Sequence, residues 1–354
     1  MTTSARITVQ LRLSSISTLT SSVRGDGFRA SFGRWPVPIS CNEAYERAQA
    51  IIPQSCLNHM TAPYVSIIIL NWNGKDMLQE CLRSASNLEY LNYNIVVVDN
   101  GSTDGSQDVV RHNFPEAHLI ENEQNLGFAE GQNTGIRYAI RSGADFIFIL
   151  NNDITLDRNV LTELVAAFEE DASIGIAGPI LYHADRPTVV QKAGAMISWS
   201  TGRTPYLGAK AIGGALSLKT IPVDSVGMFL AKAALFERIG FFDARLFSYW
   251  EDTDLCLRAK KAGCRVVCVP AAKIWHNEGS TAAKVPGLRT YYLTRNRFWM
   301  ERKYASWGAR VLFYLVFFLG IFWFNGVRFL LVERNGEAFR ALLRGTRDGV
   351  FQDS

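Results

Sequence analysis

The segment from Asp145 to Asp153 restricts the fold of this chain more than any other stretch. It reads Asp-Phe-Ile-Phe-Ile-Leu-Asn-Asn-Asp, a short apolar run that ends abruptly in three polar side chains. Such a run indicates a strand covered on both faces, as in a parallel sheet. Ligands of open α/β sheets bind beyond the carboxyl ends of the strands, which predicts a ligand or metal site at residues 151–153. The alternative is a helix N-cap, a position that Asn and Asp also favour.

The residues before this segment repeat the same pattern. Apolar runs predict strands at residues 65–70, 95–98 and 118–120, and helical spacing predicts helices at 75–86, 106–112 and 129–142. This alternation predicts βαβ units and a parallel, doubly wound sheet. After residue 153, further strands are predicted at 175–179, 223–232 and 264–269. Two more strands end in polar residues, at 71–73 and 99–104, so three strand ends should converge. The turn from Gly101 to Gly105 would let backbone approach a ligand closely.

Composition and missing motifs exclude several classes of protein. With 48% hydrophobic and 20% charged residues, the chain is expected to form a packed core. It has no Gly-x-Gly-x-x-Gly and no Walker loop, which disfavours a dinucleotide cofactor and ATP chemistry. Its six cysteines form no Cys-x-x-Cys pair, so buried thiols in a reducing cytoplasm are expected rather than zinc or disulfides.

The two ends of the chain differ from its middle. Residues 1–62 are rich in Arg, Ser and Thr and indicate a poorly defined extension, similar to a transit peptide or an over-long start. Residues 284–354 hold twelve Lys or Arg and five Asp or Glu beside an apolar run at 311–324. A basic, apolar end indicates an anionic membrane surface rather than nucleic acid. We therefore predict an N-terminal extension (1–62), an α/β domain (63–280) and a helical membrane-associated tail (281–354).

The apolar run itself is shorter than the roughly 17–25 residues that a spanning helix needs. An interfacial or re-entrant anchor is therefore predicted. The alternatives are a buried helix pair or homodimer contact, and a single span in which Arg328 reaches the membrane surface.

A second polar motif follows two aromatic residues, Tyr249 and Trp250. Glu251, Asp252 and Asp254 lie there within four positions, directly before a predicted helix at 256–262. Acids at a helix start are favoured by the helix dipole, but three of them exceed what a cap requires. Asp254 is expected to cap the helix or to pair with Arg258.

Three segments together resemble family 2 glycosyltransferases of the GT-A fold, in particular their rhamnosyltransferase-like branch. They are residues 98–105 (Val-Asp-Asn-Gly-Ser-Thr-Asp-Gly), 125–129 (Asn-Leu-Gly-Phe-Ala) and 150–153 (Leu-Asn-Asn-Asp). The resemblance runs from about Tyr64 to about Arg302. It implies inverting transfer from a nucleotide-diphosphate sugar, with rhamnose as the first candidate sugar. The absence of Gln-x-x-Arg-Trp from the sequence disfavours a processive synthase.

The resemblance also assigns roles to individual residues. Asp252 would be the general base, with Glu251 as the alternative, and Asp153 and His276 would bind Mg²⁺ or Mn²⁺. Asn151 stands where the family's Asp-x-Asp has its first Asp, and its neutral amide is a weaker metal ligand. Asp99 would contact the nucleotide base. The predicted donor-binding set is Asn71, Asn73, Asp99, Gly101, Ser102, Gly127, Asn151, Asn152 and Arg295.

The expected partners are a nucleotide-diphosphate sugar, a glycan or lipid-linked acceptor and the cytoplasmic face of the cell membrane, with no nucleic acid. The enzyme would act in cell-envelope polysaccharide synthesis. The first rival is a non-catalytic protein that binds sugar nucleotides or polysaccharides on the same fold. A nucleotidyltransferase is the second, but it would need a basic phosphate-binding loop after the first strand, where this chain offers only Lys75.

Overall fold

The computed structural model describes residues 62–208, 213–277 and 287–352, which lie within one compact unit, Ser55–Ser354. The predicted N-terminal extension lies outside the described residues, as do Cys41 and Cys56. The four described cysteines, Cys81, Cys256, Cys264 and Cys268, form no disulfide.

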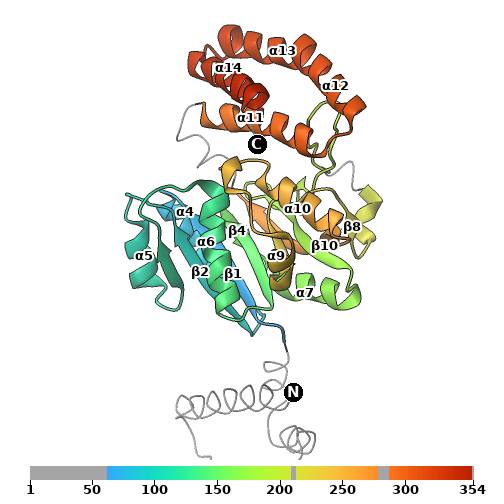
Figure 1. Ribbon diagram of the computed structural model, residues 1–354. Coiled ribbons are helices and arrows are strands. Elements are labelled where there is room, and N and C mark those ends of the chain that lie inside the picture. The colour runs from blue at the N-terminus through green and yellow to red at the C-terminus, as the bar shows by residue number, and fades with distance from the viewer. Residues whose placement is uncertain (1–61, 209–212, 278–286, 353–354) are drawn as a thin grey trace, which may run out of the picture. The chain divides into compact units, whose positions relative to one another are not determined.

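Strands of the described residues form a single mixed sheet with the order β3-β2-β1-β4-β9-β6-β10-β5, in which β7 pairs with β6 and β8 with β10 (Figure 1). The strands are β1 Val65–Asn71, β2 Tyr93–Asp99, β3 His118–Glu121, β4 Phe146–Asn151, β5 Ile154–Leu156, β6 Ile174–His183, β7 Val190–Lys192, β8 Ile221–Pro222, β9 Phe229–Lys232 and β10 Arg265–His276. The helices are α4 Lys75–Ala85, α5 Ser106–Asn113, α6 Gly127–Arg141, α7 Val160–Glu170, α9 Ala233–Ile239, α10 Glu251–Lys261, α11 Leu288–Tyr304, α12 Trp307–Val316, α13 Phe322–Val327 and α14 Gly336–Phe351.

The sheet is buried on both faces, as the apolar runs predict. Ile67 and Ile69 of β1 join a core with α4, α5 and α7, whereas Ile68 joins a second core with α6, α9 and α10. This division follows from the alternation of side chains along a strand. The parallel part, β3-β2-β1-β4, comes from the predicted βαβ units. The predicted α/β, doubly wound architecture is thereby confirmed.

The second half of the sheet departs from the sequence prediction. The short strand expected at 175–179 is the ten-residue strand β6, and the strand expected at 264–269 extends to His276 as β10. The strand expected over 223–232 is formed only at β9, which lies antiparallel between β4 and β6. Apolar periodicity located these strands but did not give their lengths, because these depend on pairing between distant segments.

The C-terminal helices form a separate apolar cluster around Phe298, Phe313 and Phe317. Residues Trp307–Val332 make one helix of 26 residues, longer than the predicted apolar run, and its most apolar window is only 17% buried. It is therefore not a buried core helix of the described chain, and it is long and apolar enough to cross a membrane. Figure 1 shows α12 and α13 above α11, with α14 beside α11. Trp307, Leu319 and Trp323 are 79%, 77% and 64% exposed.

Candidate active site

The first corner of the site lies at the carboxyl ends of β1 and β2, where Asn71 is paired in register with Asp99. The Asn71 amide donates to the Asp99 carboxylate (3.0 Å) and to the Ser102 hydroxyl (3.2 Å). Asp99 also accepts hydrogen bonds from the Ser102 backbone N–H and the Gln107 amide, both at 2.9 Å. The two strand ends are thus tied into one buried polar unit, as the sequence predicts.

The turn after β2 is shaped by this unit and by Asn73. The Ser102 hydroxyl accepts from the Asn73 backbone N–H at 2.8 Å, and the Asn73 side chain accepts from the Thr103 N–H at 2.7 Å. Gly101 has a φ of +74°, and an added Cβ would lie 2.8 Å from the backbone of Gln124. The turn therefore packs against the loop before α6, which is the second segment of the predicted motif.

At the end of β4, Asn152 turns toward the first corner. Its amide donates to the Asn71 side-chain oxygen at 2.6 Å, and an added Cβ on Gly74 would overlap this amide. Asn152 is therefore part of the scaffold of the corner. Asn151 is paired in register with Leu70 at the same edge of the sheet and is half-buried.

Asp153 and His276 are brought together although they lie far apart in the sequence. Their side chains approach to 3.4 Å between the His276 Nε2 and the Asp153 Oδ2. The strands hold them there, because His276 of β10 pairs with Ile154 of β5 and the Asn277 N–H donates to the Asp153 carbonyl. The other ring nitrogen of His276 lies 3.0 Å from the Gln191 side-chain oxygen.

This pair fits a divalent metal ion. The Gln191 side-chain oxygen accepts a hydrogen bond when Nδ1 of His276 carries a proton, and Nε2, the ring nitrogen nearer Asp153, is then the one that would bind a metal. The Asp153 Oδ1 is buried and has no hydrogen-bond partner, so it is an oxygen ligand ready for a cation. No cluster of three or more His, Cys, Asp or Glu that could hold a metal is present among the described residues. Two protein ligands with substrate phosphates and water are a common way to hold such an ion.

The acid-rich turn reaches the same edge of the sheet. A Cβ on Gly227 would lie 3.3 Å from the Asp252 Oδ2. Phe229 of β9 pairs with Ile149 of β4, and Gly227 lies two residues before Phe229, at the end of β9 that is beside the carboxyl-terminal half of β4. Asp252 therefore lies near the carboxyl end of β4, beside a glycine that has no side chain to fill the space.

Glu251 and Asp252 lie in the first turn of α10 in different surroundings. Burial raises the pKa of the Asp252 carboxyl, while hydrogen bonds from Thr253 and the charge of Lys192 lower it. Burial and the charge of Asp252 raise the pKa of Glu251 well above its ordinary value. The Glu251 side chain is buried, and its Oε2 has no partner. Glu251 is therefore held in its neutral form more strongly than Asp252.

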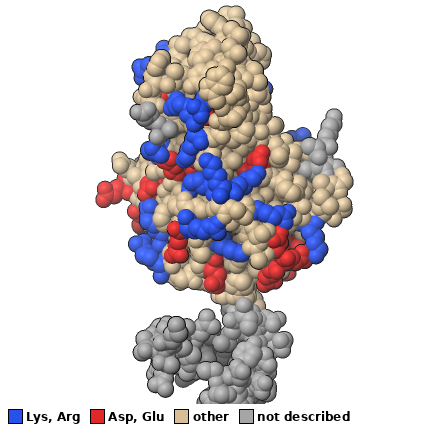
Figure 2. Space-filling view, turned by 45° about the vertical axis from the view of Figure 1, so that its right-hand side comes forward, with Lys and Arg blue, Asp and Glu red and all other residues tan. Residues whose placement is uncertain are grey.

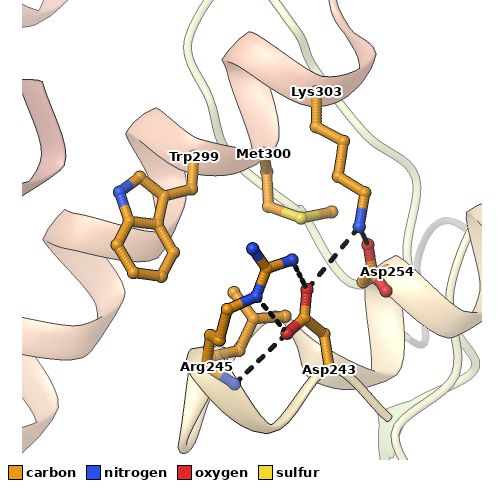
Figure 3. A pocket seen from close by; sticks show the side chains of 7 residues that line it. Asp243, Arg245, Asp254, Trp299, Met300 and Lys303 are labelled. Atoms are coloured by element: carbon orange, nitrogen blue, oxygen red, sulfur yellow. Dashed lines mark hydrogen bonds and ion pairs between the residues drawn. The ribbon is translucent and has the colours of Figure 1, made fainter. Parts of the chain in front are cut away.

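Asp254 plays a structural role, and its expected pairing with Arg258 is confirmed. Its fully buried carboxylate contacts Arg258 at 2.8 Å, Lys303 at 2.7 Å and the Tyr304 hydroxyl at 2.7 Å. Figure 3 shows the small pocket at this junction, where Lys303 of α11 reaches Asp254 and Asp243. Its volume of about 10 Å³ suits one water molecule, not a sugar.

The turn before α10 is strained and is held by residues that sequence reasoning missed or assigned differently. Phe247, Tyr249 and Trp250 have φ values of 62°, 67° and 75°, in the left-handed region that costs energy for residues other than glycine. The amide of Asn296 donates to the carbonyls of Leu246 (2.9 Å), Ser248 (3.0 Å) and Tyr249 (2.8 Å).

Arg295 acts beside Asn296. Its guanidinium donates to the carbonyls of Arg245 (2.7 Å) and Leu246 (3.2 Å) and lies over the Trp299 ring. These contacts occupy the group that the sequence interpretation directed at the donor, so Arg295 is engaged with the turn. Its role in donor binding remains a prediction.

Phe247 connects the turn to the donor corner. Its carbonyl accepts from the Ala129 N–H at 3.1 Å. Gly127 has a φ of +82°, and an added Cβ would lie 2.5 Å from the Phe247 ring. The 125–129 loop and the acid-rich turn are therefore in direct contact, and the predicted motifs surround a single site.

Comparison with known proteins identifies the family of the chain. Residues 66–240 match the family described as "Glycosyl transferase family 2". The chain is a glycosyltransferase of family 2, and its GT-A fold carries the site just described.

Two curated relatives transfer rhamnose by name. The chain is 29% identical to the dTDP-rhamnosyl transferase RfbF of Shigella flexneri, over 61% of this chain and 73% of the relative. It is 25% identical to the N-acetylglucosaminyl-diphospho-decaprenol L-rhamnosyltransferase of Mycobacterium tuberculosis, over 69% of this chain and 86% of the relative. A mannosyltransferase from Pyrobaculum calidifontis, solved with GDP-Man and Mn²⁺, has the same fold, with a TM-score of 0.51 and 15% identity over 88% of this chain and 97% of that one.

Proposed function

We propose that the protein is an inverting, non-processive glycosyltransferase that moves a sugar from a nucleotide-diphosphate donor to a glycan or lipid-linked acceptor. The observation that carries this proposal is the position of Asp252 beside Gly227, two residues before the strand β9 that pairs with β4, the strand that leads to Asn151 and Asp153. Rhamnose from dTDP-rhamnose is the first candidate donor, because two relatives carry rhamnosyltransferase names.

In this mechanism Asp252 accepts the proton of the acceptor hydroxyl as its oxygen attacks the anomeric carbon. Attack from the face opposite the leaving group inverts the configuration. Asp252 is preferred over Glu251 because burial and the charge of Asp252 raise the pKa of the Glu251 carboxyl well above its ordinary value, which favours its protonated form. The Thr253 N–H, 2.6 Å from the Asp252 Oδ1, leaves Oδ2 directed toward Gly227.

Asp153 and His276 would hold Mg²⁺ or Mn²⁺. When bound, such an ion neutralises the charge that develops on the departing nucleoside diphosphate. Gln191 orients the imidazole through Nδ1. The polar unit of Asn71, Asp99 and Ser102 would receive the nucleoside, with Asp99 as the acceptor for the base.

The C-terminal helix supports action at a membrane surface. Its apolar side chains are mostly exposed, and Figure 2 shows Lys and Arg gathered below a nearly uncharged region. Basic side chains next to an apolar helix favour an anionic membrane surface, in agreement with the cytoplasmic face. A lipid-linked acceptor in cell-envelope glycan synthesis fits this location.

The test is to incubate the purified protein with nucleotide sugars, Mn²⁺ and a lipid-linked acceptor, and to measure release of nucleoside diphosphate. We expect release only when donor, metal and acceptor are together, with the opposite anomeric configuration in the product by NMR. Donor binding without release from any of a panel of donors and acceptors would instead support the non-catalytic sugar-nucleotide-binding protein.

A further inference from the structure

A second, larger hollow lies beside the acid-rich turn. It has a volume of about 320 Å³ and is lined by residues 202–205, Trp250, Leu293 and Arg297. Trp250 immediately precedes Glu251 and Asp252 and links the hollow to the catalytic turn. The other two walls are the segment after β7 and helix α11. The hollow is therefore separate from the donor corner but adjacent to the proposed base, which is where an acceptor would bind.

Two guanidinium groups line this hollow without a partner. Among the contacts of the described residues, the side chains of Arg203 and Arg297 make no hydrogen bond and no ion pair, and the Arg297 Nε is buried. Burial and the neighbouring charge of Arg203 lower the pKa of Arg297 to about 10. An unpaired buried guanidinium is costly, and two together favour an anion that accepts several hydrogen bonds.

The nearby carboxyl of Glu301 forms no ion pair with either arginine among the contacts of the described residues. Glu301 lies one turn beyond Arg297 on α11, and both of its carboxylate oxygens are buried without a hydrogen-bond partner. Burial raises the pKa of Glu301 to about 8, although the charges of Arg297 and Arg310 lower it. At neutral pH this carboxyl is held mostly protonated, and the hollow keeps its positive charge.

The hollow also borders the apolar C-terminal helix. An added Cβ on Gly202 would lie 2.7 Å from both the Arg297 side chain and the Phe313 ring of α12. Phe313 belongs to the helix Trp307–Val332, whose apolar side chains are mostly exposed. A ligand held by the two arginines would thus have the catalytic turn on one side and a membrane-facing helix on the other.

We propose that Arg203 and Arg297 bind the phosphate or diphosphate of a lipid-linked acceptor, with its sugar toward Asp252 and its hydrocarbon chain along the helix Trp307–Val332. This inference rests on the proposed function for the identity of the reaction, but the binding site itself can be tested without turnover. Planar guanidinium groups bind phosphate oxygens in a bidentate manner.

The experiment measures binding to phosphatidylcholine vesicles with and without a polyprenyl diphosphate, by flotation. Wild type should prefer the vesicles that contain the diphosphate lipid. Arg203→Gln and Arg297→Gln should each weaken that preference by roughly 10- to 100-fold, the loss of a charged hydrogen bond. Arg344→Gln, which removes an exposed charge from α14, is the matched control and should bind as wild type does.

Arg203 is exposed, so Arg203→Gln tests the site even if Arg297→Gln fails to fold. Equal binding to both vesicle types, or equal losses in all three variants, would overturn the proposal. Inorganic diphosphate could instead raise the melting temperature of wild type but not of Arg203→Gln, while wild type shows no preference between the vesicles. That result would assign the site to a free phosphate and overturn the proposal of a lipid ligand. Selective vesicle binding without sugar transfer would refute the proposed function and leave this inference intact.

Discussion

Replacing Asn296 by Ala tests whether the strained turn is held in place by α11. The side chain is fully buried and donates to three backbone carbonyls, those of Leu246, Ser248 and Tyr249. The amide has two hydrogens and so makes two full hydrogen bonds to these carbonyls, and the side-chain oxygen accepts a third from the Arg295 Nε at 2.9 Å. At about 1–2 kcal/mol for each of the three, Asn296→Ala should lower the free energy of unfolding by about 3–6 kcal/mol.

The same substitution should reduce catalysis beyond its effect on stability. Phe247, Tyr249 and Trp250 store strain of about 1–3 kcal/mol each, which the turn releases by relaxing once Asn296 is gone. Asp252 lies two residues beyond Trp250. Since a displacement of about 1 Å can cost about 10²-fold in rate, kcat should fall by up to about 10²-fold at temperatures where the variant is folded.

The assay compares urea unfolding and kcat for Asn296→Ala and for Asn133→Ala. Asn133 is a similarly buried Asn whose amide bridges the backbone N–H (2.9 Å) and carbonyl (3.0 Å) of Phe242 and makes no hydrogen bond to the strained residues 247–250. It should lose similar stability and keep a kcat close to wild type. If Asn296→Ala kept the wild-type kcat, or if both variants lost kcat equally, the positioning argument would be wrong.

Three further predictions concern metal binding, pH and the donor loop. Gln191→Leu should raise the Mn²⁺ concentration for half-maximal activity by about 10- to 100-fold, because His276 loses its Nδ1 partner; an unchanged metal titration would contradict this. The pKa of the Glu301 carboxyl is raised from 4.5 to about 8 in the folded protein. Between these pH values the folded protein therefore keeps a proton on Glu301 that the unfolded chain has released. Stability should therefore fall as pH rises from about 4.5 to about 8, and Glu301→Gln should flatten that slope in a melting-temperature series; an unchanged slope would refute the assignment. Gly127→Ala should lower the free energy of unfolding by at least about 1–2 kcal/mol through its left-handed backbone alone, as measured by urea unfolding. It should also weaken donor binding, measured by calorimetry, because the added Cβ pushes the Phe247 ring. Wild-type values in both measurements would contradict this prediction.

The parallel half of the sheet could be predicted because its signals are local. Each strand from β1 to β4 is a continuous apolar run, and each ends in polar residues that parallel pairing brings to one edge. The pairing of Asn71 with Asp99 follows directly. The lengths predicted for β6 and β9 were wrong, because these strands pair with segments that lie far away in the sequence.

The site residues likewise divide into those with a local sequence signal and those that only the fold brings together. Asp153 and His276 are separated by a long stretch of sequence, so only the resemblance to a known family predicted that they would meet. Gln191, which orients His276, carries no sequence signal that distinguishes it from a surface residue. Asn296 follows Arg295 in a helix of ordinary composition, and only the folded backbone shows that the carbonyls of the turn face it.

The proposed mechanism depends most on Asp252 as the base that activates the acceptor. The direct measurement is the single-turnover rate of sugar transfer by Asp252→Asn with saturating donor and acceptor, together with the donor dissociation constant. The rate is predicted to fall by about 10²–10⁴-fold with donor affinity retained, and Glu251→Gln should lose less. A rate for Asp252→Asn equal to that of wild type would show that Asp252 is not the base.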